Sequence, residues 1–119
     1  MMAPLQRMQI LQDRERGAVI VAPAGRLDSL RAPTLRDALA ALDTAGERRI
    51  VLDLAGVDYV SSAGLAVLFE LAKRMHANGG VMALCALHVH VRRVIELAGY
   101  MHHFTITTTR EEAVAHVTS

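Results

Sequence analysis

Two adjacent serines, Ser61 and Ser62, stand where a loop is expected to run into a helix. The loop, residues 55–61, follows a short apolar strand, and this edge of the sheet is where α/β proteins usually build their sites. A serine hydroxyl at a helix start commonly accepts a backbone N–H, which stabilises the helix by about 1 kcal/mol. Free N–H groups and the positive end of the helix dipole also favour an anion, so either serine could instead accept a phosphate.

A serine nucleophile would need a strained turn of the form G-x-S-x-G and a general base elsewhere in the chain. The segment here reads Val60-Ser61-Ser62-Ala63-Gly64, so the first glycine is missing, and no other segment suggests a triad. We therefore expect no hydrolytic activity and predict that the chain is not an enzyme.

No metal or cofactor site is expected. The chain has six histidines and one cysteine, and their spacing matches neither H-E-x-x-H nor paired C-x-x-C. The histidines are His76, His88, His90, His102, His103 and His116. The sequence also lacks the phosphate-binding forms G-x-x-x-x-G-K-[ST] and G-x-G-x-x-G. Arg92 and Arg93 have no aromatic neighbours and are interpreted as solvated charges, not as an RNA-binding surface.

The elements that must position the serines are indicated by changes in the hydrophobic period, which predict the order β-β-α-β-α-β-α-β-α. Expected strands cover residues 8–14, 18–24, 49–54, 81–86 and 104–107, and expected helices cover residues 31–44, 62–77, 89–98 and 110–117. Strands that alternate with helices run parallel, whereas the first two strands form a hairpin. We predict an α/β fold with one domain over residues 1–119, a mixed sheet of four or five strands, and about four helices.

Composition fits a globular chain, because 52% of its 119 residues are hydrophobic and 21% are charged. A net charge of +1 predicts no attraction to nucleic acid or to an anionic membrane. The single cysteine, Cys85, lies in an apolar run and is interpreted as a buried small hydrophobe, consistent with a reducing compartment. No apolar stretch approaches about 18 residues, and residues 1–7 lack the apolar core of a signal peptide. We therefore expect a cytoplasmic protein that does not insert into membranes.

The helix expected over residues 62–77 has one unusual feature. If Leu65 is at the centre of its buried face, the apolar side chains of Val67 and Leu71 fall near the outer side. Either neighbouring elements cover these two side chains, or they form an exposed apolar strip for a protein partner.

Three segments together resemble the STAS-domain proteins, and among them the small, free-standing anti-sigma factor antagonists. Residues 25–28, Gly-Arg-Leu-Asp, are similar to the family's G-x-L-D turn after the second strand. Residues 51–65 are similar to its strand, loop and D-S-[SAT]-G-L signature, and residues 85–99 to its third-helix segment. The resemblance covers about residues 8–117. Two positions depart from the pattern: Ser61 stands where the family often has Asp, and the third helix begins His88-Val89 instead of Ser-Pro.

The resemblance implies a small α/β sandwich with helices mostly on one side of the sheet. It implies that a partner serine kinase, which is also the anti-sigma factor, phosphorylates the serine two residues before the motif glycine, which is Ser62 here; Ser61 is the second choice. The unphosphorylated form would bind the anti-sigma factor and free the sigma factor, and a PP2C-type phosphatase would reset the phosphorylated form.

The docking surface implied by the resemblance would contain Asp28, Ser61, Ser62 and Gly64. It would extend to Val67 and Leu71 if these side chains are exposed. Family members of this kind suggest a monomer when alone. Other STAS roles stay open as alternatives: a scaffold in a stress-signalling complex, or a cytoplasmic subunit of a membrane transporter for lipids or anions.

Overall fold

A tight hairpin opens the described part of the chain. The computed structural model describes residues 8–119, so the argument against a signal peptide, which rests on residues 1–7, lies outside the described part. Strands β1 (Gln9–Glu15) and β2 (Ala18–Ala24) pair antiparallel across a two-residue turn, Arg16-Gly17. Both turn residues have positive φ, 50° and 85°. A two-residue turn with positive φ at both positions has a backbone twist that matches the right-handed twist of the two strands it joins.

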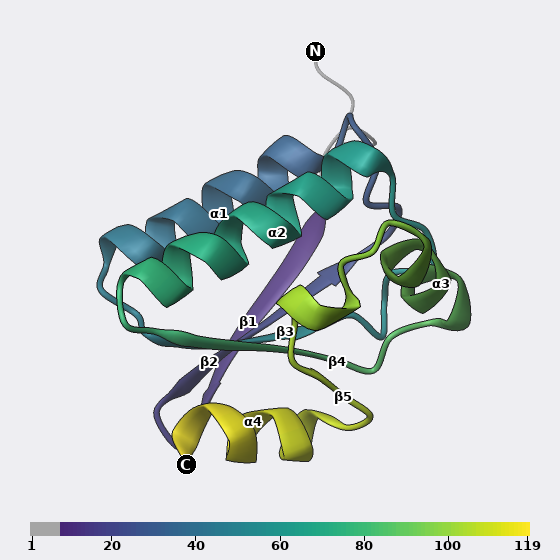
Figure 1. Cartoon of the computed structure of the whole chain (residues 1–119). Helices are drawn as coiled ribbons and strands as arrows, with labels where there is room; N and C mark the ends of the chain where they lie inside the picture. The colour runs from purple at the N-terminus through teal and green to yellow at the C-terminus, as the bar shows by residue number, and fades with distance from the viewer. Residues whose placement is uncertain (1–7) are drawn as a thin grey trace.

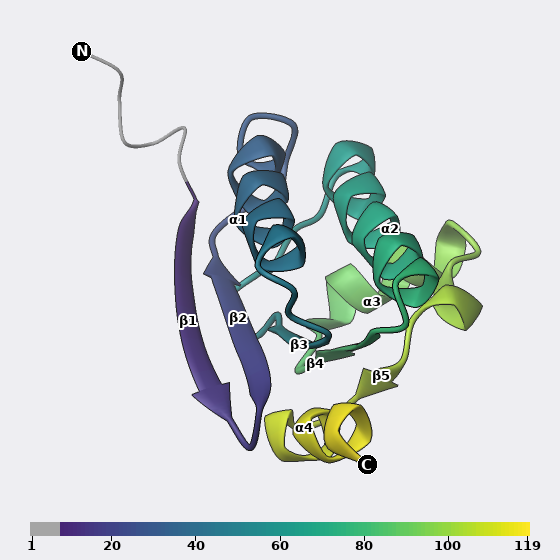
Figure 2. The same cartoon turned by 90° about the vertical axis from the view of Figure 1, so that its left-hand side faces the viewer.

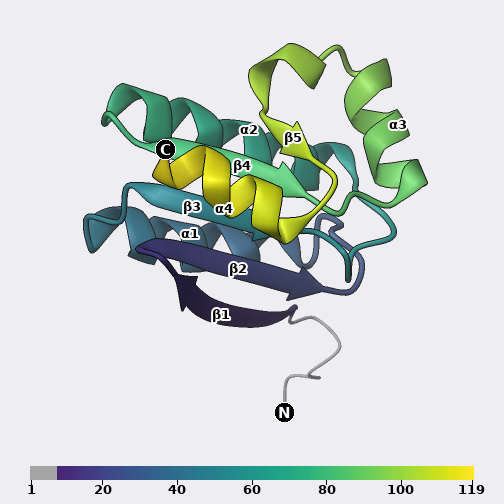
Figure 3. The same ribbon diagram turned by 90° about the horizontal axis from the view of Figure 1, so that it is seen from below.

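The sheet has five strands in the order β1-β2-β3-β4-β5, with β2 to β5 parallel to one another (Figures 1 and 3). This confirms the predicted mixed sheet and element order. The remaining strands are β3 (Arg49–Asp53), β4 (Val81–Cys85) and β5 (Ile106–Thr107); the helices are α1 (Ala32–Thr44), α2 (Ser62–Ala77), α3 (Val89–Leu97) and α4 (Arg110–Thr118). A short 3-10 helix, η2 (Met101–His103), was not predicted from the sequence.

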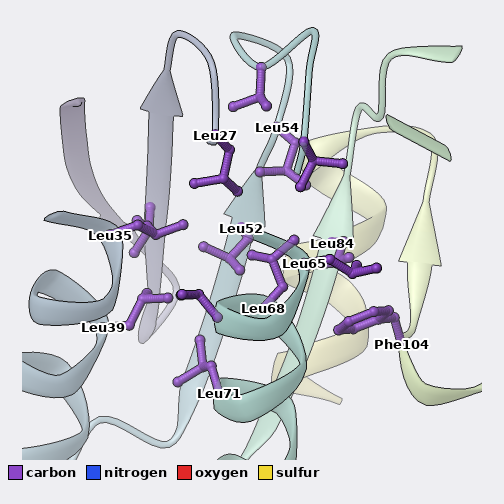
Figure 4. Packing of buried hydrophobic residues seen from close by; sticks show 14 of the residues in the cluster. Leu27, Leu35, Leu39, Leu52, Leu54, Leu65, Leu68, Leu71, Leu84 and Phe104 are labelled. Atoms are coloured by element: carbon purple, nitrogen blue, oxygen red, sulfur yellow. The ribbon is translucent and has the colours of Figure 1, made fainter. Parts of the chain in front are cut away.

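Helices cover both faces of the sheet. Figure 2 shows α1 and α2 side by side on one face and α4 on the other. The α1/α2 side holds the larger cluster of buried side chains, to which α3 also contributes, and Figure 4 shows leucines of β3, β4, α1 and α2 gathered there. A smaller cluster, which includes the buried Cys85, lies under α4. Three helices on one side and one on the other agree with the arrangement that the resemblance implied.

Helix α2 buries two of its faces instead of one. Leu65 and Leu68 belong to the core between helix and sheet, whereas Val67 and Leu71 are only 3% and 5% exposed. Val67, Leu71 and Leu39 of α1 line the floor of a small groove between the two helices. The exposed apolar strip that the sequence left open is therefore not present, because α1 covers that side of α2.

An ion pair joins α4 to the end of β3. The Asp53 carboxylate is nearly buried, and its Oδ2 lies 2.9 Å from both Nε and Nη2 of Arg110. Its Oδ1 accepts the backbone N–H of Ala55 at 3.0 Å. The hydrogen bond to Asp53 raises the pKa of the Arg110 guanidinium, although burial works against it. This pair fixes the start of α4 beneath the edge of the sheet where the loops turn toward α2.

Candidate functional site

Two loops lie side by side at the carboxyl edge of the parallel strands. The segment after β2 runs parallel to the segment after β3, through short bridges at Ala24–Gly56 and Leu27–Val60. The Leu27 N–H donates to the Tyr59 carbonyl at 3.0 Å, and the Leu27 carbonyl accepts the Ser61 N–H at 2.9 Å. The G-x-L-D turn and the serine motif, far apart in sequence, are thereby joined into one backbone unit.

The side chains that these loops and the first residue of α2 present to solvent form a surface that we call the serine edge. Its main side chains are those of Arg26, Asp28, Leu30, Tyr59, Ser61 and Ser62.

Ser61 and Ser62 have different structural roles. Ser61 is the N-cap of α2: its hydroxyl oxygen accepts the Gly64 N–H at 3.1 Å, and its hydroxyl donates to the Leu27 carbonyl at 3.3 Å. Ser62 is the first helical residue and is exposed, and no side-chain hydrogen bond holds its hydroxyl within residues 8–119. The capping role expected for one of the serines belongs to Ser61, which leaves the Ser62 hydroxyl free for chemistry.

Gly64 is where the loop after β2 touches α2. A Cβ added at Gly64 would lie 2.5 Å from the Leu27 carbonyl oxygen and 2.6 Å from Leu27 Cγ. Gly64 itself is buried, so it cannot form part of an exposed docking surface as expected. Its role is instead to let Leu27 approach the helix, which brings the two loops of the serine edge together.

Asp28 occupies the first turn after the loop contact. Its Oδ1 accepts the backbone N–H groups of Leu30 and Arg31 at 3.2 and 3.0 Å, and its Oδ2 lies 2.6 Å from Nη1 of Arg31. Burial raises the pKa of Asp28, but the hydrogen bonds and positive charge of Arg31 outweigh it and lower the pKa overall. Asp28 therefore places a fixed negative charge one residue from Leu27, the residue bonded to Ser61.

Arg26 and Tyr59 were not singled out from the sequence, although both lie in the quoted motifs. The guanidinium of Arg26 lies 4.0 Å from the centre of the Tyr59 ring, a cation–π contact across the two loops. Tyr59 remains 39% exposed, and Leu30, which follows Asp28 closely, is 61% exposed. The serine edge thus combines charge with apolar area, the composition of a protein-binding surface. A large exposed residue in a loop beside the serines is the signal that could have found Tyr59.

Within residues 8–119 there is no group of three His, Cys, Asp or Glu side chains placed to hold a metal ion. No helix in that part of the chain is long and apolar enough to cross a membrane. At the start of α3, where the sequence lacks the Ser-Pro pair, His88 is the N-cap and its Nδ1 accepts the His90 N–H at 3.3 Å.

The fold and the serine edge match one family. Residues 9–113 match the family model for the STAS domain, and the chain belongs to this family. A similar relative is BtrV of Bordetella bronchiseptica, provisionally named an anti-sigma factor antagonist, which is 41% identical over 108 residues, with 91% of this chain and 93% of BtrV covered. The anti-sigma F factor antagonist of Paenibacillus polymyxa is 32% identical over 96 residues, covering 77% and 80% of the two chains.

A solved structure is similar along the whole chain. The crystal structure of an anti-sigma factor antagonist from Mycobacterium paratuberculosis superposes with a TM-score of 0.87 at 26% identity, and the match covers 100% of both chains. Relatives in sequence and in structure therefore carry the same kind of name, that of a regulatory binding protein.

Proposed function

We propose that this protein is an anti-sigma factor antagonist whose binding is switched by phosphorylation of Ser62. The observation that carries the proposal is the exposed Ser62 hydroxyl, which is free of hydrogen bonds within the described residues and lies at the start of α2 among the side chains of the serine edge. The names of the relatives supply the class of partner, an anti-sigma factor. In the unphosphorylated form, the serine edge binds that partner and the sigma factor is released.

Phosphorylation would weaken this binding by electrostatics and desolvation. A serine kinase, which is the anti-sigma factor itself, transfers the γ-phosphoryl group of ATP to Ser62 Oγ; an O–P bond forms, and ADP and the hydroxyl proton are released. The phosphate adds about −1.5 to −2 charges to the serine edge, where the carboxylate of Asp28 is already paired with Arg31. Burying that charge in an interface costs free energy, and a few kcal/mol of differential affinity is enough for a switch.

The reset step is hydrolytic. A PP2C-type phosphatase adds water across the O–P bond of phosphorylated Ser62, which releases inorganic phosphate and restores the hydroxyl. ATP binding and both covalent steps belong to the partners, so the protein acts by binding and not as an enzyme. The proposed setting is the cytoplasm, and the proposed state of the protein alone is a monomer.

Mass spectrometry after incubation with host lysate and Mg-ATP tests the modification. We expect one phosphate on wild-type protein and on Ser61→Ala, located at Ser62, and none on Ser62→Ala. Phosphate on Ser61 would keep the function but move the site. Phosphate on neither serine, under conditions where a known substrate of the lysate kinase is modified, would contradict the switch.

Binding tests the consequence. Ser62→Ala should bind the anti-sigma factor constitutively, and Ser62→Asp should lose most of its affinity because it introduces a negative charge at the same position. Both substitutions leave the Ser61 cap intact, so a difference in binding cannot come from loss of the helix start. Equal binding by the two variants, both folded, would refute the proposed switch.

A further inference from the structure

Four of the six histidines surround one hollow, far along α2 from Ser62. His76 lies in the last turn of α2, His102 and His103 form most of η2, and His116 lies in the last turn of α4. All four line a hollow of about 310 Å³, which we call the histidine hollow. Figure 3 shows α4 running along β3 and β4, which brings the final turn of α4 to the amino end of β4. Elements separated in sequence thus bring the same kind of side chain to one place.

The hollow adjoins a second one that adds a permanent positive charge. The second hollow lies between α2 and η2 and shares His76, His102 and His103 with the first; Lys73 lines it as well. Lys73 Nζ lies 5.6 Å from the centre of the Phe69 ring, which lines the second hollow as well. Phe69 also makes an edge contact with His103, at 5.1 Å between ring centres.

The acidic side chains of α2 and α4 lie outside the two hollows. None of the described residues that line either hollow is acidic. On α2, Glu70 lines the groove against α1 instead and lies 3.4 Å from Arg74. On α4, Glu111 and Glu112 lie in the first turn, at the opposite end of the helix from His116, and Glu112 is engaged with the N-cap. Val81 and Met82 of β4, and Phe104 and Thr105 just before β5, also line the hollow and carry no charge.

The floor of the hollow can hold a small ligand. Met75 and Phe104 are buried beneath it, and Thr105, half-buried, adds a hydroxyl to the lining. A volume of about 310 Å³ lies at the lower end of the range for small-molecule sites. Imidazolium and ammonium groups are donors without competing acceptors, which suits an oxyanion.

From this arrangement we infer that the histidine hollow is a binding site for a small phosphate-type oxyanion, distinct from the serine edge, and that it takes up its ligand as the histidines become protonated. Histidine side chains gain their charge between about pH 8 and pH 5. Four histidines line the first hollow and Lys73 lines the second, and the described residues of the two linings include no other basic side chain. Affinity for a dianion should therefore rise steeply as the pH falls.

Sulfate is the probe of choice for this test, because it keeps its double charge over the whole range, so a change in affinity reports on the protein. Calorimetric titration at constant ionic strength should show affinity at about pH 5.5 at least tenfold higher than at about pH 7.5. Resonances of the ring protons of the four hollow histidines should shift on adding sulfate, and those of His88 and His90 should not. Affinity that is independent of pH, or the absence of any binding at about pH 5.5, would overturn the inference.

Two matched variants locate the site. His76→Gln/His102→Gln removes two imidazole side chains from the hollow and spares His103, which packs on aromatic rings. It should lower sulfate affinity at about pH 5.5 at least fivefold. The control, His88→Gln/His90→Gln, removes the two histidines at the start of α3 and should change affinity less than twofold. If the two variants behave alike, binding is non-specific and the inference fails. Should the double variant not fold, the exposed His116→Gln serves the same purpose.

A second titration distinguishes a free phosphate ion from a phosphate ester as the ligand of the hollow. Inorganic phosphate and glycerol phosphate are compared at about pH 6. Tighter binding of the ester would assign the site to a phosphate ester, and equal binding would assign it to the free ion. Failure of both to bind would contradict the inference. None of these outcomes depends on Ser62, so they do not bear on the proposed partner switch.

Discussion

Substituting alanine for Gly64 tests how the serine edge is assembled. The new Cβ would lie 2.5 Å from the Leu27 carbonyl oxygen, whereas ordinary contact begins at about 3.4 Å. The carbonyl would have to retreat by about 0.9 Å. It cannot do so freely, because it also accepts hydrogen bonds from the Ser61 N–H at 2.9 Å and the Ser61 hydroxyl at 3.3 Å.

Helix propensity and close packing predict changes of opposite sign in the free energy of unfolding of Gly64→Ala. Replacing glycine by alanine within a helix normally stabilises it by about 0.5–1 kcal/mol. Overpacking of a close contact costs about 1–3 kcal/mol, and here the contact is with backbone, which cannot rotate away. We expect Gly64→Ala to lower the free energy of unfolding by about 2 kcal/mol, equivalent to a fall in Tm of about 6–12 °C.

Urea denaturation followed by circular dichroism measures this free energy. The matched control is Ala66→Gly, an exposed position two residues further along α2, which should lose about 1 kcal/mol through propensity alone. If helix propensity alone determined stability at positions 64 and 66, Gly64→Ala would raise the free energy of unfolding by about as much as Ala66→Gly lowers it. A Gly64→Ala protein as stable as the wild type would refute the close approach of Leu27 to α2.

Three further predictions concern single side chains. Ser61→Ala should lose about 1 kcal/mol of stability because the cap is lost, whereas Ser62→Ala should stay within about 0.5 kcal/mol of wild type by the same urea titration. Ala86 has φ of 58°, so Ala86→Gly should raise stability by about 0.5–1 kcal/mol; a loss would show that the backbone there is relaxed. Burial raises the pKa of the Cys85 thiol to about 12, so stability should fall as the pH rises above about 9, and iodoacetamide should modify Cys85 only after unfolding. Rapid modification of the native protein would contradict that last prediction.

Local patterns were enough to predict most of the fold. The continuous apolar run at residues 49–54 indicated a strand buried on both faces, and β3 is that strand. The start of α2 at Ser62 agrees with the sequence because a serine cap and an apolar repeat coincide there. The order of elements along the chain and the mixed character of the sheet were also predicted, from the initial hairpin and the alternation of strands and helices that follows it.

Local sequence patterns could not predict which elements, distant in sequence, pack against one another in the fold. Periodicity placed Val67 on the outer side of α2 when Leu65 was taken as the centre, but it could not show that α1 packs against that side. The ion pair of Asp53 with Arg110 joins residues 57 positions apart, and no spacing rule reaches that far. The helix η2 is too short to show a repeat.

For the candidate site, the sequence identified both serines but could not divide their roles. That division depended on the Leu27 carbonyl, which belongs to another loop and is the acceptor that orients Ser61. The gathering of the four histidines was likewise hidden, because they are supplied by three separate elements.

The different roles of Ser61 and Ser62 have a consequence for which substitutions can accumulate at these two positions during evolution. Ser61 carries the structural duty, with its hydroxyl bonded on both sides, and Ser62 carries none that the fold requires. The fold therefore does not depend on a hydroxyl at position 62, whereas the proposed switch does. Under the proposed switch, one substitution at that position would give a protein of equal stability that the kinase no longer phosphorylates there. Control by phosphorylation could thus be gained or lost at position 62 while the fold of the protein stays unchanged.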